Sequence, residues 1–265
     1  MDKVISEAEV KIHVPTLGNK LLTKVVKKIN DNKEVYALWK VVNTNALKRI
    51  GFSDHGSVHF QIVSNISLRF ARILAKHKVQ MSVTKDFGLD NDYAEVVIFL
   101  ASILHDVGMS VARDGHEEFS LFIVNNLLRE ILKFMPVEKR TIVISEVLHA
   151  IISHRDDGKP VTVEAGIVRI SDALDMSKGR SRIPYEKGEI GIHAISAAAI
   201  NKVEILEGKE VPIEIGIEMN NSSGVFQIDE LLKSKIKGSG LEKYIQVKAY
   251  IKDGKEDNLI KEFTL

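Results

Sequence analysis

The chain has 265 residues, enough for one large domain or for one domain with a smaller companion. Hydrophobic residues make up 45% of it and charged residues 28%, and 37 Lys and Arg against 36 Asp and Glu leave a net charge of +1. This balance excludes a globally basic nucleic-acid-binding protein and an acidic disordered chain, and the absence of cysteine excludes disulfides, thiolate zinc sites, iron–sulfur clusters and cysteine nucleophiles.

The N-terminal segment and the hydropathy of the chain bear on its location. The first ten residues are polar and lack the apolar stretch of a signal peptide. The longest apolar run covers residues 96–104, far fewer than the about 20 residues that a membrane-spanning helix needs. We therefore expect a cytoplasmic protein with no membrane partner.

Residues 1–52 are predicted to form a helical N-terminal extension that packs on the domain that follows. Apolar residues recur at helical spacing over residues 21–29 and again over residues 35–42. The polar stretch Asn30-Asp31-Asn32 separates the two runs.

Residues 53–188 show the pattern of successive helices joined by polar turns. Ser53 and Asp54 are good N-cap residues for the first helix, and Thr162 is one for the last. The second helix is apolar almost all round, which is typical of a buried core helix, and Gly108 supplies its stop. We expect helices at about residues 53–76, 92–106, 114–134, 139–154 and 163–176.

The pattern changes near residue 188, where Ile and Val begin to alternate with polar residues, as in strands. Runs at 203–205 and 213–218 flank Glu207-Gly208-Lys209, a typical hairpin turn. A helix at 229–236 and strands at 244–251 and at the C-terminus complete the pattern. The fold class is therefore mainly α, a helical bundle followed by a small α+β C-terminal domain over residues 189–265.

Three lysines in the C-terminal part, Lys233, Lys235 and Lys237, form a small basic cluster. We interpret it as a solvated helix edge rather than as a contact with nucleic acid. The sequence carries no strong signal for a nucleic-acid partner.

Histidine and aspartate side chains are predicted to face the interior of the helical bundle. His59 shares a helix face with the apolar residues Ile62 and Ile66, so it points inward. His105 and Asp106 end the apolar helix. An imidazole and a carboxylate at the end of a buried helix are unfavourable unless something binds them.

Asp172 lies on the packed side of a third helix, which it shares with Ala165 and Val168. Taken singly, each of these polar residues is more often a hydrogen-bonded core His or a capping Asp. Taken together, two imidazoles and two carboxylates on three inward faces favour a site for a divalent metal, with Mn, Fe, Ni, Zn or hydrated Mg as candidates.

The ordered set His59, His105-Asp106 and Asp172 resembles the H…HD…D signature of the HD-domain superfamily of metal-dependent phosphohydrolases. The phrases HFQIV, LHDVG and SDALD around these residues support the resemblance. It implies an all-helical HD-domain bundle, a metal held by His59, His105, Asp106 and Asp172, and a catalytic role for His105, Asp106 and Asp172. It covers only the helical part of the chain and does not explain the C-terminal domain.

Some members of that superfamily hold two or three metals through additional histidines. His116 and His154 are the candidates for further ligands here, so one or two ions are expected. His149 lies five residues before His154, about 500° around a helix, so the two side chains point roughly 140° apart and cannot both reach one ion. The role of His149 stays open. Because Arg155 follows His154, the sequence shows no clear counterpart of the paired histidines of the multi-metal members.

Residues near the motif helices are candidates for orienting the ligands or binding substrate. Asp175, one turn from Asp172, could orient an imidazole or pair with an arginine. His55, one turn before His59, could line the rim of the site or cap its loop, and no role is assigned to His193. A phosphate substrate also needs cationic groups, and the candidates are Arg113, Lys178, Arg180 and Arg182. For the stretch 178–182, compensation of a helix dipole is the alternative.

The leading hypothesis is a metal-dependent phosphohydrolase that acts on a nucleotide or another phosphate mono- or diester through metal-activated water. The alternative is a regulatory or binding HD protein that senses a nucleotide with little or no turnover. A third hypothesis, a di-iron oxygenase, requires His116 and His154 to be ligands. The expected partners are a small phosphorylated substrate and a second copy of the chain in a homodimer.

Overall fold

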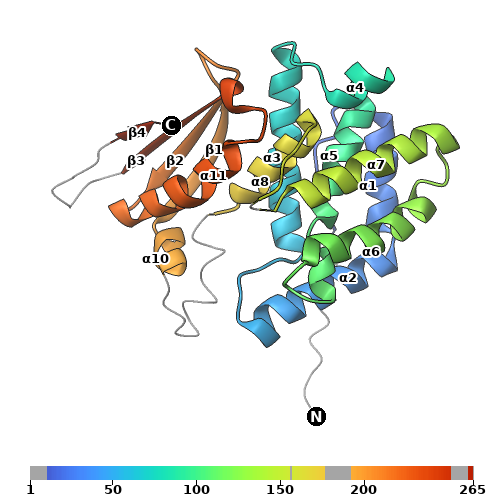
Figure 1. The fold of residues 1–265 in the computed structure, drawn as a ribbon, viewed down its shortest axis with the longest axis horizontal. Helices are drawn as coiled ribbons and strands as arrows, with labels where there is room; N and C mark the ends of the chain where they lie inside the picture. Colours follow the sequence, from blue (N-terminus) through green and yellow to red (C-terminus); the bar gives the residue numbers. More distant parts are fainter. Residues whose placement is uncertain (1–10, 156, 177–191, 252–261, 265) are drawn as a thin grey trace.

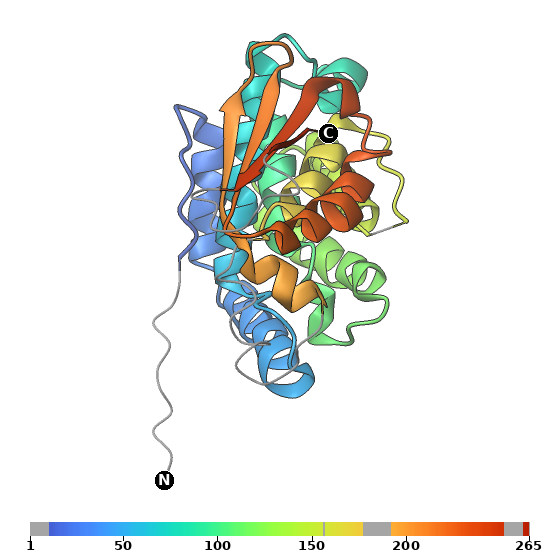
Figure 2. The same ribbon diagram turned by 90° about the vertical axis from the view of Figure 1, so that its left-hand side faces the viewer.

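A helical bundle and a four-stranded sheet lie side by side in the molecule (Figure 1). The computed structural model describes residues 11–155, 157–176, 192–251 and 262–264. Figure 2, viewed from the side of the sheet, shows the strands in front of the helices. The predicted fold class, a mainly α bundle followed by a small α+β region, is confirmed.

The elements of the bundle follow one another along the chain and end before the sheet begins. They are α1 (Lys20–Asn30), α2 (Lys33–Asn43), the π-helical turn η1 (Thr44–Ile50), α3 (Ser57–Lys76), α4 (Ser82–Phe87), α5 (Asn91–Leu104), the 3-10 turn η2 (Val107–Ser110), α6 (His116–Ile131), α7 (Val137–Ser153) and α8 (Val163–Ala173). The short helix α4 was not predicted.

Two helix starts show how local hydrogen bonds set the boundaries. The helix predicted from Ser53 begins only at Ser57, because the Asp54 carboxylate accepts the Gly56 N–H at 2.8 Å and closes a local turn instead. At α8 the predicted cap is confirmed, since the Thr162 hydroxyl accepts the Ala165 N–H at 3.2 Å.

Helix α5 is the centre of the bundle and packs against α1, α3, α7 and α8. Every residue from Val96 to Leu104 is buried. The stretch Asn91–Ser110 is long and apolar enough to cross a membrane by composition, but 83% of that window is buried inside the protein. It is therefore a core helix, and it delivers its last residues into the middle of the bundle.

The N-terminal helices hold the turn that follows α5. The Trp39 indole N–H of α2 donates to the Ile103 carbonyl at 3.0 Å. The Asn45 side-chain amide donates to the carbonyls of Met109 at 2.8 Å and Ser110 at 3.1 Å. Residues far apart in sequence thus fix the backbone on both sides of His105 and Asp106.

The sheet has the order β1-β2-β3-β4. Its strands are β1 (Ile200–Glu207), β2 (Ile213–Met219), β3 (Ile245–Ile251) and β4 (Glu262–Thr264). The predicted hairpin between β1 and β2 is confirmed by their antiparallel pairing and by the Gly208 N–H, which donates to the Pro212 carbonyl at 3.1 Å. Strands β2 and β3 are parallel, and β3 and β4 are antiparallel.

The connection between the parallel strands β2 and β3 crosses over through helical turns, as parallel pairing requires. The helix predicted at 229–236 is present as the π-helical turn η4 (Gln227–Leu232) continued by α11 (Lys233–Ile236). Shorter elements, α10 (Ile192–Ala198), η3 (Ser222–Gly224) and η5 (Glu242–Tyr244), complete this region.

The crossover helices pack directly on α8. A Cβ atom at Gly166 of α8 would overlap the Ser239 carbonyl oxygen and lie 3.3 Å from the Leu241 side chain, so the two backbones meet closely there. The predicted domain boundary at residue 188 lies outside the described residues, and the division into domains stays a prediction.

Two glutamates, the buried Glu164 and the half-buried Glu146, lie near α4. Glu164 is fully buried and caps α4 by accepting the N–H groups of Ser82 at 3.1 Å and Val83 at 3.0 Å. The nearby Glu146 has a buried Oε2 with no hydrogen-bond partner among the described residues. Burial, together with the negative charges of Glu164 and Asp86, raises the pKa of Glu146.

Glu146→Gln is expected to raise the free energy of unfolding at pH 8 by about 1 kcal/mol, since it removes a charge that the fold disfavours. Because the folded-state pKa is raised, protonation of Glu146 stabilises the wild-type fold, and that stabilisation is lost as the pH rises through the folded-state pKa. The advantage of the variant should therefore shrink as the pH is lowered. Denaturant titrations of both proteins at pH 5 and pH 8 test this. A free energy of unfolding that is the same in the variant and the wild type at pH 8 would contradict it.

Candidate metal centre

Five imidazoles surround the carboxylate of Asp106, which is only 3% exposed. His55 precedes α3, His59 lies on α3, His105 follows α5, His116 opens α6 and His154 follows α7. The Nε2 atoms of His55, His59 and His105 lie 3.9, 3.6 and 3.3 Å from Asp106 Oδ2, and those of His116 and His154 lie 3.2 and 3.5 Å from Asp106 Oδ1.

The other ring nitrogen of each imidazole is engaged. The Nδ1 atoms pair with Ser53 O for His55 (2.8 Å), Asp175 Oδ2 for His59 (2.7 Å), Ser102 O for His105 (2.9 Å), Arg113 O for His116 (2.7 Å) and Ile151 O for His154 (2.6 Å). Because each partner is an acceptor, Nδ1 is the donor, and in the neutral ring the Nε2 lone pair faces Asp106. This is the arrangement of metal-binding histidines. Asp175 orients the imidazole of His59, one of the two roles that the sequence suggested for it.

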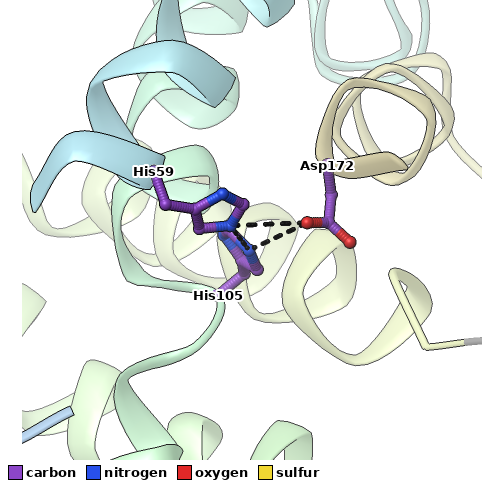
Figure 3. A group of neighbouring side chains, drawn as sticks. All are labelled: His59, His105 and Asp172. Atoms are coloured by element: carbon purple, nitrogen blue, oxygen red, sulfur yellow. Dashed lines mark hydrogen bonds and ion pairs between the residues drawn. The ribbon is translucent and has the colours of Figure 1, made fainter. Parts of the chain in front are cut away.

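The first donor set combines His59, His105 and Asp172 (Figure 3). The two Nε2 atoms are 3.2 Å apart, and Asp172 Oδ1 lies 3.4 Å from that of His59 and 3.6 Å from that of His105. With Asp106 Oδ2, the structure brings together all four residues that the signature singled out.

The second donor set lies on the other side of the same carboxylate. Asp106 Oδ1 faces His116 and His154, whose ring centroids are 5.6 Å apart. Glu117 lies close enough to add an oxygen, because one ligand atom from each of His116, Glu117 and His154 lies within 4.8 Å of the others. Sequence reasoning missed Glu117, although its position beside His116 was the available signal. Asp106 thus offers one oxygen to each set.

The turn after His105-Asp106 brings the second set into place. The buried Ser120 hydroxyl of α6 donates to the His105 carbonyl at 2.7 Å and accepts the Gly108 N–H at 2.8 Å. A Cβ atom at Gly108 would overlap the His116 carbonyl oxygen. The start of α6 therefore rests directly on the turn, which places His116 beside Asp106.

The buried carboxylates give the site a strong preference for positive charge. Burial alone lowers the pKa of His105, but the carboxylates of Asp106 and Asp172 outweigh it and raise that pKa to about 10. Burial alone raises the pKa of both acids, yet the imidazoles hold the pKa of Asp106 and of Asp172 well below the usual value. For His116 as well, burial lowers the pKa, and Asp106 and Glu117 outweigh it and raise that pKa above its usual value.

A divalent ion must displace the protons that these carboxylates hold on the imidazoles. With the pKa of His105 at about 10, metal affinity is expected to rise with pH between 6.5 and 8.5, by about tenfold per unit for each displaced proton. Calorimetric titration with Mn²⁺ in buffers of different ionisation enthalpy counts the released protons. An affinity independent of pH over this range would contradict the expectation, and His149→Ala is the control that should titrate like wild type.

His149 lies outside both donor sets. Its Nε2 accepts the Val161 N–H at 3.1 Å, and burial lowers its pKa. The divergence expected from the five-residue spacing between His149 and His154 is thus observed. His193 lies in α10.

Of the four predicted cationic residues, Arg113 is the one that the structure describes. Its guanidinium carbon lies 3.6 Å from the centroid of the Phe52 ring, which stacks on His55 at 5.1 Å. His55, Phe52 and Arg113 thus form a stack that begins beside Asp106 and ends at the exposed Arg113. Lys178, Arg180 and Arg182 lie outside the described residues.

The lysine cluster does not form a uniformly solvated edge. Lys233 and Lys237 are exposed, but Lys235 is 9% exposed, and its Nζ donates to the His154 carbonyl at 2.6 Å. The interpretation is therefore wrong for Lys235, because the crossover helix docks on the end of α7 and buries this side chain.

The sequence matches known proteins over the residues that build this site. A family model described as HD domain matches residues 59–177. The chain is 40% identical over 235 residues to the uncharacterized protein MJ1020 of Methanocaldococcus jannaschii, covering 88% of this chain and 90% of that protein. No solved structure gives a significant match.

Proposed function

The chain belongs to the HD-domain superfamily, and from this premise we propose that it is a metal-dependent phosphohydrolase whose centre binds two divalent ions on either side of Asp106. The observation that carries the proposal is that five Nε2 atoms face the two oxygens of the buried Asp106 carboxylate, with a second carboxylate, Asp172, beside two of them. The proposed substrate is a nucleotide or another phosphate mono- or diester.

The donor chemistry fits such ions. Neutral imidazoles with carboxylates suit Mn, Fe, Ni and Zn, and Mg with water as further ligands. His59, His105, Asp106 and Asp172 would hold the first ion. Asp106, His116 and His154 would hold the second, with Glu117 in reach.

When bound, such ions polarise a phosphoryl oxygen and generate a nucleophile from water near neutral pH. The protein orients the site: Asp175 Oδ2 accepts a hydrogen bond from the Nδ1–H of His59, which leaves Nε2 facing the donor set. Arg113 carries positive charge at the outer end of the stack that begins at His55, where an anionic substrate would approach. Lys178, Arg180 and Arg182 are proposed to add further cationic contacts.

Hydrolysis assays test this proposal. The Mn²⁺-loaded protein is incubated with a panel of phosphate monoesters, phosphodiesters and nucleoside phosphates, and product release is measured. We expect turnover in the wild type and in His149→Ala, and a loss of about 10³-fold or more in the double variant His105→Ala/Asp106→Ala. Undiminished turnover in that metal-free double variant would overturn the proposal.

The same metal-loaded proteins distinguish two alternative functions from hydrolysis. A nucleotide that binds tightly and stays intact with every metal would support the regulatory alternative. The meeting of His116 and His154 at Asp106 also satisfies the condition of the di-iron oxygenase hypothesis. Oxygen consumption by the iron-loaded protein without phosphate release would favour it.

The proposal includes a cytoplasmic location, no membrane partner and a homodimer. Size-exclusion chromatography with light scattering tests the homodimer, and an elution as monomer at micromolar concentration would contradict it.

A further inference from the structure

The crossover helix of the sheet touches the residue that carries a donor of the second set. Lys235 of α11 is buried, and its ammonium group donates to the main-chain carbonyl of His154 at 2.6 Å. The imidazole of the same residue has its Nδ1 on Ile151 O and its Nε2 facing Asp106 Oδ1. His154 is therefore held at its backbone from one side while its ring faces the metal centre.

A second buried cation completes this arrangement. Arg169 of α8 is 2% exposed and donates to the carbonyls of Ser153 at 3.2 Å and Arg155. Its Nε also donates to the Lys235 carbonyl at 3.1 Å, which ties the two cations together. Three successive carbonyls at the end of α7 thus accept bonds from cationic side chains.

The end of a helix is where backbone geometry is least determined by the helix itself, because the last carbonyls have no partners within it. His154 is the C-cap residue of α7, so its ring position depends on groups outside that helix. Cations at this end also interact favourably with the helix dipole. The contact of Gly166 with Ser239 keeps α11 and the loop after it close against α8.

We propose that Lys235 is a positioning residue for the second metal site, through which the C-terminal α+β region controls how tightly that site binds its ion. The proposal rests on the two-metal function proposed above. Lys235 acts through His154: its hydrogen bond to the carbonyl fixes the backbone that aims the imidazole at Asp106 Oδ1. The first set takes its donors from α3, α8 and the end of α5, and none of them belongs to His154, the residue that this bond holds.

The test compares Lys235→Met with wild type by calorimetric titration of the metal-free full chain with Mn²⁺. Lys235→Met keeps an apolar stem of similar length and removes the donor. We expect two ions in both proteins, with the second bound about 10- to 100-fold more weakly in the variant and the first unchanged. Lys235→Arg, which keeps charge and donors, should recover much of the affinity, and Lys237→Met, an exposed lysine two residues further, is the matched control.

A mutant cycle separates positioning from general stability. In a His154→Ala background, which lacks the second imidazole, Lys235→Met should have no further effect on Mn²⁺ binding. If Lys235→Met does not give the helical circular dichroism spectrum of the wild type, Lys235→Leu, which also lacks a donor, replaces it in every comparison.

Three results would overturn the proposal: unchanged second-site affinity in Lys235→Met, equal weakening of both ions, or a persistent effect in the His154→Ala background. A wild type that binds only one Mn²⁺ ion at saturation is a different outcome. It would refute the two-metal function itself, and the positioning role with it.

Discussion

Asp106→Ala is expected to lose both metal ions and to reduce hydrolysis by about 10³-fold or more. Each oxygen of this carboxylate faces a different donor set, Oδ2 toward His59 and His105, and Oδ1 toward His116 and His154. Removal of the side chain takes one donor from each set and leaves the imidazoles without their shared negative charge. Elemental analysis of the dialysed proteins measures the loss, from two ions per chain to fewer than one.

Two further variants serve as comparisons for the metal content of Asp106→Ala. His154→Ala should lose only the second ion, because the first set does not include that ring. Asp114→Ala, an exposed aspartate in the loop before α6, should keep both ions. If Asp106→Ala retained two ions after dialysis, this carboxylate could not join the two sites.

Gly108→Ala should destabilise the fold by about 3 kcal/mol or more, or displace the start of α6. A Cβ atom there would overlap the carbonyl oxygen of His116 and lie 2.5 Å from the backbone nitrogen of Ser120. Both atoms belong to the backbone of α6, so a side-chain rotation cannot relieve the overlap. If the chain accommodates the methyl group by moving α6, His116 moves with it and the second ion is lost. Thermal denaturation and Mn²⁺ titration measure the two effects.

Gly216→Ala is the matched control for this substitution. Gly216 lies in β2, and a Cβ atom added there would have Glu204 Cβ as its nearest neighbour at 3.9 Å, an ordinary van der Waals contact. A small increase in the free energy of unfolding is expected, since alanine reduces the conformational freedom of the unfolded chain. Equal stabilities of wild type and Gly108→Ala, with two ions bound to each, would show that α6 does not depend on this close approach.

The first donor set could be anticipated from the sequence because its order and spacing carry physical meaning. Helical periodicity placed His59 and Asp172 on packed faces, and the apolar run before His105 showed that this pair ends in the interior. Burial of an imidazole with a carboxylate requires compensation, and that requirement does not depend on the details of the fold.

The contacts that complete the site depend on where helices end and cross. Glu117 meets the second set only because the turn at Gly108 seats the first residues of α6 on Asp106. The sequence predicts Lys235 on a solvated helix edge because it lies in a cluster of three lysines with Lys233 and Lys237. Its burial follows from the docking of α11 on α8, which no local pattern records.

In the sheet, too, local sequence patterns predicted the elements but not how all of them pair. Alternating residues predicted the strands and the β1–β2 hairpin, since both are properties of short segments. The parallel pairing of β2 with β3 joins residues 213–219 to residues 245–251 through a crossover. Alternation identifies which face of a strand is buried, but it does not specify the partner strand or its direction.

The most direct test of the two-metal centre is anomalous X-ray scattering from crystals of the Mn²⁺-loaded protein. Two peaks are expected, one among His59, His105, Asp106 and Asp172, and one among Asp106, His116 and His154. A single peak, or peaks that do not contact Asp106, would contradict a centre in which this carboxylate joins two ions.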